Sequence, residues 1–231
     1  MGRRVRGRWG WVVLAVALIA PLAGVTAAHP AVATVPPLRA ESVVTGGFHS
    51  CALMEDDSTR CWGAGLSSLG YPGHQGHVGD DEAPAEVGPI DLGAGRRVLS
   101  LGAGLSHSCA ALDDGSVRCW GQDEDGKLGN STASEQGDPA TAPPVDLGAA
   151  AVSVDAGWDH SCAVLVGGSL RCWGRSRSGD LGLGNTDTIG DDEAVASVPP
   201  IDLGAGRTVT AVAVGLAHTC AVLDDGSEIG R

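Results

Sequence analysis

One pattern occurs four times along this chain and constrains its fold more than any other feature. Each copy places a His, a Ser or Thr and a Cys in succession, within the segments that begin at Gly46, Gly102, Asp155 and Ala213. The cysteines are Cys51, Cys109, Cys162 and Cys220, at spacings of 58, 53 and 58 residues. Short apolar segments and glycine turns repeated at this period are typical of β-propeller blades. No window sustains a helical apolar period, so we predict an all-β chain.

Composition and charge narrow the class further. The chain has 36 glycines among 231 residues and only 3% aromatic residues, which suits thin and tightly turned β-structure. Its formal net charge is −13, and this charge argues against nonspecific binding to nucleic acid or to anionic lipid. We therefore expect no nucleic-acid partner.

Each copy also contains a predicted hairpin. In the second copy, pairing Cys109 with Cys119 sets Leu112 opposite Ser116 and leaves a three-residue loop that ends at Gly115. Such loops favour the left-handed conformation at the third position, which glycine adopts without strain. Gly168 and Gly226 occupy this position in the third and fourth copies, whereas the first copy has Asp57, a poorer residue for it.

The hairpin register predicts how the cysteines pair. Cys109 and Cys119 fall on a non-hydrogen-bonded pair, where Cα atoms lie about 4.5 Å apart and a disulfide is allowed. We therefore predict three disulfides, Cys51–Cys61, Cys109–Cys119 and Cys162–Cys172. The alternative is a metal site made of His107, Cys109 and Cys119, but structural zinc sites use four ligands. The fourth copy has Gly230 at the second cysteine position, which leaves Cys220 unpaired.

The other conspicuous side chains recur in the same way. They are the histidines His49, His107, His160 and His218, and the tryptophans Trp62, Trp120 and Trp173. A catalytic histidine is expected once, with a distinct partner, so we interpret these histidines as hydrogen-bonded packing residues. We expect the tryptophans to pack between blades, although exposed rings could also anchor a binding partner.

The N-terminus has the pattern of a secretory signal peptide. Four arginines precede an apolar run, and small residues surround a predicted cleavage point after Ala33. An uncleaved membrane anchor is the alternative, for which the apolar run is short. We expect a secreted, periplasmic or cell-surface protein without a membrane association after cleavage, in a compartment where disulfides persist.

The repeated residues resemble the regulator of chromosome condensation repeat family over roughly residues 45–231. The matching segments are Gly104–Ala111, Asp114–Gly121 and Gly126–Gly129, then Gly157–Val164, Gly168–Gly174 and Gly179–Gly182. The cysteine pairs and the "GDDEA" loops further resemble secreted bacterial members. The resemblance implies a propeller of about seven four-stranded blades that acts as a rigid interaction platform. The nucleotide-exchange activity of the nuclear family member on a small GTPase is an alternative that the acidic charge and predicted export disfavour.

Two acidic loops are candidate calcium sites, Asp80-Asp81-Glu82 and Asp191-Asp192-Glu193. Calcium prefers clustered oxygen ligands, but the spacing is not that of an EF-hand, and solvated acidic loops are common. A calcium-binding surface protein is therefore an alternative function. We find no unique acid and nucleophile pair and no nucleotide-binding or protease motif, so we expect no catalytic activity and no cofactor other than calcium.

These observations combine into one prediction. The expected organisation is a signal peptide at 1–33, a linker or first strand at 34–45, repeats at 46–98, 99–151 and 152–209, and a truncated repeat at 210–231. This corresponds to about three complete four-stranded blades plus part of a fourth, in an incomplete ring. The incompleteness favours a truncated or frame-shifted product, and the alternative is self-association through open blade edges or Cys220. The predicted function is that of an exported, noncatalytic protein-interaction module that binds an unknown partner through loops on one face.

Overall fold

The sheets of this protein are built from three consecutive strands each. The computed structural model describes residues 39–65, 67–74, 76–131 and 134–230, so the predicted signal peptide lies outside the described residues. Within these ranges, four antiparallel sheets follow one another along the chain. The strands are β1 (Ala40–Thr45), β2 (His49–Met54), β3 (Thr59–Gly63), β4 (Val98–Ala103), β5 (His107–Leu112), β6 (Val117–Gly121), β7 (Ala151–Ala156), β8 (His160–Leu165), β9 (Leu170–Gly174), β10 (Val209–Val214), β11 (Thr219–Leu223) and β12 (Glu228–Gly230).

The all-β prediction is confirmed. The described helices are a single turn, α1 (Pro84–Val87), and a 3-10 turn at Val195–Ser197, and both lie in the long loops between sheets. Each first strand has a register shift near its start, between Ala40 and Ser42 in β1 and at the equivalent residues of β4, β7 and β10. The four sheets therefore share the same strand order and the same irregularity in their first strand.

The sheets contain three strands and not the predicted four. In place of a fourth strand, an isolated antiparallel bridge joins Gly63 to Val78, and the second and third sheets have the same bridge. The ladder stops because Gly63 has a φ of 111°, which is far from the extended conformation of a strand. Gly121 and Gly174 have equivalent angles, so the ladder stops at this point in each of these sheets.

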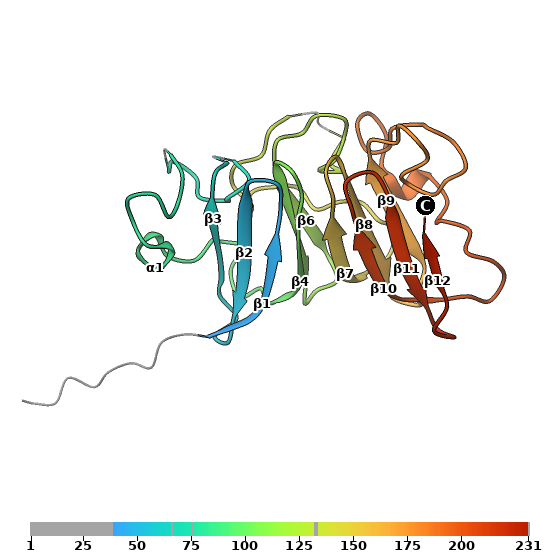
Figure 1. Cartoon of the computed structure of the whole chain (residues 1–231), viewed down its shortest axis with the longest axis horizontal. Helices are drawn as coiled ribbons and strands as arrows, with labels where there is room; N and C mark the ends of the chain where they lie inside the picture. The colour runs from blue at the N-terminus through green and yellow to red at the C-terminus, as the bar shows by residue number, and fades with distance from the viewer. Residues whose placement is uncertain (1–38, 66, 75, 132–133, 231) are drawn as a thin grey trace, which may run out of the picture. The chain divides into compact units, whose positions relative to one another are not determined.

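Successive sheets contact each other through their first strands, as β4 does with β7 and β7 with β10 (Figure 1). Backbone hydrogen bonds also connect neighbouring turns, from the Gly47 N–H to the Gly104 carbonyl and from the Leu105 N–H to the Gly157 carbonyl. Every residue of β5 and of β8 is buried, whereas β1 is largely exposed. The second and third sheets thus supply most of the apolar core.

Candidate functional site

The predicted hairpins have the predicted geometry. The Leu112 N–H donates to the Ser116 carbonyl at 2.9 Å, and Gly115 closes the loop with a φ of 82°. Gly168 and Gly226 each have a φ of 81°, and Asp57 also adopts the left-handed conformation, at 63°. The sequence pattern therefore predicts the loop correctly even where glycine is absent.

The structure joins the three predicted cysteine pairs as disulfides. Their Cα atoms lie 4.1, 4.1 and 4.0 Å apart, and all six cysteines are buried. Cys220 is a free and exposed thiol. The alternative metal site at His107 loses its two thiolate ligands to the bond between Cys109 and Cys119. The cysteines are structural links within each hairpin.

Three of the four repeated histidines connect one sheet to the next. His49 Nε2 lies 2.7 Å from Ser108 Oγ, His107 Nε2 lies 2.8 Å from Ser161 Oγ, and His160 Nε2 lies 3.0 Å from Thr219 Oγ1. In each case the acceptor is the residue that directly follows the histidine of the next sheet. The recurring His-Ser or His-Thr dipeptide therefore provides one side-chain contact at each boundary between successive sheets.

The hydroxyl groups that contact the histidines determine which ring nitrogen carries the proton. Ser108 Oγ donates its proton to the Ser68 carbonyl at 2.9 Å, so the hydroxyl accepts from His49 Nε2. The Nδ1 atoms of His49 and His107 are buried without a hydrogen-bond partner. Burial lowers the pKa of His49 to about 4. Burial and the nearby Lys127 charge hold the pKa of His107 well below its usual range. These side chains are neutral near pH 7.

The neutral histidines predict that acid destabilises the fold. An unfolded histidine has a pKa of 6.5, and folded His49 has a pKa of about 4. The unfolded state binds more protons between these values, so the free energy of unfolding falls as pH decreases through this window. The His49→Gln variant removes one titrating group and is expected to show a shallower fall, measured by urea unfolding at several pH values.

Two buried carboxyls also contribute to the pH dependence of stability, with the opposite sign. Burial raises the pKa values of Asp123 and Asp155, so these carboxyls act in the opposite direction and stabilise the fold as pH decreases. They are present in both proteins, and the difference between the native chain and the variant isolates His49. Identical pH dependence in the two proteins would contradict the assignment.

Two tryptophans strengthen the contact between neighbouring sheets. The Trp120 indole N–H donates to the Ser68 carbonyl at 2.9 Å, and the Trp173 indole N–H donates to the Lys127 carbonyl at 3.0 Å. Both rings are completely buried. Trp62, on the first sheet, is only half-buried. The Ser68 and Lys127 carbonyls thus each accept two hydrogen bonds from the following sheet, one from a hydroxyl and one from an indole.

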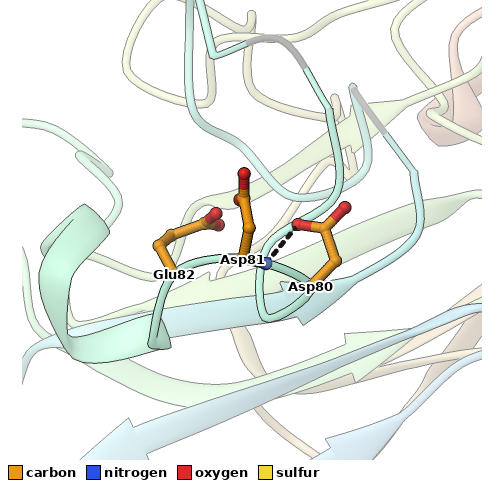
Figure 2. Close-up of side chains that lie close together, drawn as sticks. All are labelled: Asp80, Asp81 and Glu82. Carbon is orange, nitrogen blue, oxygen red and sulfur yellow. Dashed lines mark hydrogen bonds between the residues drawn. The ribbon is translucent and has the colours of Figure 1, made fainter.

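The two acidic loops each bring their carboxylates together. In Asp80-Asp81-Glu82 and in Asp191-Asp192-Glu193, one ligand atom from each residue lies within 4.8 Å of the others. Figure 2 shows the first loop, where the Asp81 N–H donates to Asp80 Oδ1 at 2.9 Å. A hydrogen bond between the Asp81 and Glu82 carboxyls raises the pKa of Glu82 and lowers that of Asp81. The loop therefore concentrates negative charge near the surface.

The structure has a surface groove between the turns that precede the histidines, which the sequence does not predict. The groove has a volume of about 880 Å³. It is lined by one apolar side chain from the turn between the first and second strands of each sheet: Phe48, Leu105, Trp158 and Leu216. Phe48 is 65% exposed, Trp158 41% and Leu216 60%. The sequence does contain a sign of this groove. In every copy a large apolar residue follows the repeated glycine within two residues, in a turn where small or polar residues would be expected.

Charged side chains of both signs lie around these four apolar residues. Lys127 Nζ lies 3.3 Å from Asp159 Oδ1 and is almost fully buried. Arg175 lies 3.7 Å from Asp159 and 3.2 Å from Asp125. The groove therefore combines an apolar contact surface with an ordered ionic network, which is the usual composition of a protein-binding surface. In the described ranges, no helix has the length and apolar character needed to cross a membrane.

Comparison with known proteins agrees with this architecture. The Regulator of chromosome condensation (RCC1) repeat matches residues 98–127 and 151–180 in one form and 114–164 and 168–222 in another. The chain is 31% identical over 198 residues to the ultraviolet-B receptor UVR8 of Arabidopsis thaliana, covering 85% of this chain and 42% of the receptor. It thus spans less than half the length of that relative.

Solved structures show the same fold. Human WBSCR16 superimposes with a TM-score of 0.66 at 22% identity, covering 83% of this chain and 48% of that one. Prp20p from Saccharomyces cerevisiae superimposes with a TM-score of 0.60 at 22% identity, covering 82% and 43%. The sheets described above are β-propeller blades, and the chain belongs to the regulator of chromosome condensation repeat family.

Proposed function

We propose that this chain is an exported, noncatalytic module that binds a partner protein through the groove lined by Phe48, Leu105, Trp158 and Leu216. The observation that carries the proposal is that large apolar side chains from the turns of four successive sheets converge at the surface of this groove. Exposed apolar clusters of this kind, with charged groups around them, mark interaction sites. The three buried disulfides support residence in an oxidising compartment.

The relatives support a protein partner. Prp20p of Saccharomyces cerevisiae binds Gsp1p and histones, and the same yeast protein has been solved in complex with Kap60. For the present chain, a net charge of −13 favours a partner with a basic surface, which electrostatic attraction would steer toward the groove. Guanine-nucleotide exchange on a small GTPase is the alternative activity, and it requires access to the cytoplasm.

The groove can be tested by site-specific photo-cross-linking in the host that encodes the protein. A photoreactive residue at Leu216 is expected to form adducts with a partner protein in the extracytoplasmic fraction. The same residue at Val166, which is 64% exposed in a hairpin loop outside the groove, is the matched control and should form none. Equal adducts at the two positions, or none at either, would contradict the proposal. An exported form that begins at Thr34 would support cleavage of the signal peptide.

Calcium binding by the acidic loops is a second candidate, favoured by the convergence of three carboxylates in each loop. A bound cation would relieve their mutual repulsion, and calcium is then expected to raise the melting temperature through preferential binding to the folded state. The control is a double variant, Asp80→Asn with Asp191→Asn, in which the shift should be reduced. A melting temperature that does not change between calcium and chelator would dismiss the site.

A further inference from the structure

Two turns beside the groove each end at a buried histidine. The Gly46 N–H donates to the His49 carbonyl at 2.8 Å, and the Gly104 N–H donates to the His107 carbonyl at 2.8 Å. Each imidazole ring also lies against the glycine of its own turn. A methyl group on Gly46 would lie 2.9 Å from His49 Cε1, and one on Gly104 would lie 2.5 Å from His107 Nδ1. The position of the ring and the conformation of the turn therefore depend on each other.

Only one nitrogen of each ring can take up a proton. Ser161 Oγ lies 2.8 Å from His107 Nε2 and donates its own proton to the Lys127 carbonyl at 3.3 Å, so His107 Nε2 already carries a proton. Ser108 imposes the same arrangement on His49. The Nδ1 atoms of both rings are buried and have no hydrogen-bond partner among the described residues. A proton on Nδ1 would therefore place a positive charge and an unpaired donor in the interior, which is unfavourable unless the ring moves toward water.

The charged groups that face these rings do not compensate a proton on Nδ1. Lys127, on the loop after β6, has the same sign of charge as protonated His107, and its ammonium is paired with Asp159 at 3.3 Å. The histidines of the neighbouring sheets also face His107 and would repel it when protonated. His160 is different, because burial lowers its pKa but the carboxylates of Asp180 and Asp159 act in the opposite direction. The acid-sensitive rings are therefore those at the first two boundaries between sheets.

We propose that uptake of a proton by Nδ1 opens each of these two turns, so that acid reversibly dismantles the Phe48–Leu216 groove. Phe48 directly precedes His49, and Leu105 lies two residues before His107. An imidazole that reaches water regains its ordinary pKa of 6.5, whereas the closed turn excludes the proton. The population of the open turn is therefore expected to rise by up to about tenfold for each pH unit below this value. The effect on partner binding rests on the proposed function, but the opening of the turns does not.

Amide hydrogen exchange, followed by NMR on the full oxidised chain, tests the opening without a partner. After correction for the intrinsic exchange rate, we expect the protection of the Gly46 and Gly104 amides to fall about tenfold or more between pH 7 and pH 5. His107→Gln keeps a side-chain N–H donor but does not titrate, so it should abolish the fall at Gly104 and leave it at Gly46. His49→Gln should do the reverse. His77→Gln, at an exposed residue, should change neither turn.

These variants separate acid-driven opening from a role in packing alone, which would lower protection at both pH values without changing its pH dependence. Protection that does not change with pH at either turn, or variants that alter both turns equally, would overturn the proposal. If His107→Gln does not fold, His49→Gln decides the question at its own turn.

A photoreactive residue at Leu105 tests the consequence for binding. Its adducts with a partner protein should be lost at pH 5, regained at pH 7 and retained at pH 5 in His107→Gln. Adducts that persist at pH 5 in the native chain would overturn the acid control of the groove. Absence of adducts at both pH values would contradict the proposed function, and amide exchange would still decide whether the turns open.

Discussion

Replacing Trp173 by Ala is expected to lower the free energy of unfolding by about 3 to 5 kcal/mol. The Trp173 ring is fully buried between the second and third sheets, and a closely packed interface closes only part of the space that the ring leaves. The variant also removes a hydrogen bond to the Lys127 carbonyl, which keeps only its bond from Ser161. Urea unfolding of the oxidised protein measures the loss.

Two other tryptophans provide matched controls for this experiment. Trp62 occupies the equivalent position in the first sheet but is only half-buried, so Trp62→Ala should cost clearly less. Trp158 is 41% exposed in the groove, and Trp158→Ala should change stability little. Trp173→Phe keeps most of the apolar contact and isolates the hydrogen bond, at about 1 to 3 kcal/mol. Equal losses for Trp62→Ala and Trp173→Ala would contradict a role for the ring between blades.

Removing the disulfide in the second sheet is expected to cost about 3 kcal/mol. The bond between Cys109 and Cys119 closes a short loop, and its loss increases the conformational entropy of the unfolded chain. The double variant Cys109→Ala with Cys119→Ala tests this without leaving an unpaired thiol from this disulfide. Its unfolding midpoint in urea should fall, with little change in the native secondary structure.

Cys220→Ser is the control for the disulfide experiment, because Cys220 is free and exposed and contributes no covalent link. Its unfolding midpoint should match that of the native chain. Treatment with a strong reductant should lower the midpoint of the native chain further than the double variant does, because all three bonds are then lost. A midpoint unaffected by the double variant would show that the hairpins are stable without their covalent links.

The hairpins and their disulfides could be predicted because they depend on local spacing. Ten residues separate the cysteines of each pair, and Gly115 or its equivalent closes the loop between them. Register follows from loop length in such hairpins, so the facing residues follow directly. In the first copy, Asp57 adopts the same left-handed conformation as the glycines of the other copies. The pairing of the two strands and the disulfide offset the backbone strain of this conformation.

The number of strands in each sheet could not be predicted in this way. The resemblance to the family implies four, and the structure has three with one bridge. Gly63 and its equivalents leave the extended conformation at the point where the bridge forms, with the Gly63 Cα packed against the turn at Phe48 and His49. Glycine allows both an extended and a left-handed backbone, so its identity alone does not say where a ladder ends.

The sequence by itself determined the repeat, because the same residues recur in each copy. It also determined the hairpin register and the cysteine pairing, because these depend on residues within about a dozen positions of one another. Only the tertiary structure decided what lies between the sheets. His49 meets Ser108 across 59 residues, and Trp173 meets the Lys127 carbonyl across 46. The Phe48–Leu216 groove likewise exists only where sheets pack together. Such contacts depend on how separate blades are oriented, which spacing within one repeat does not encode.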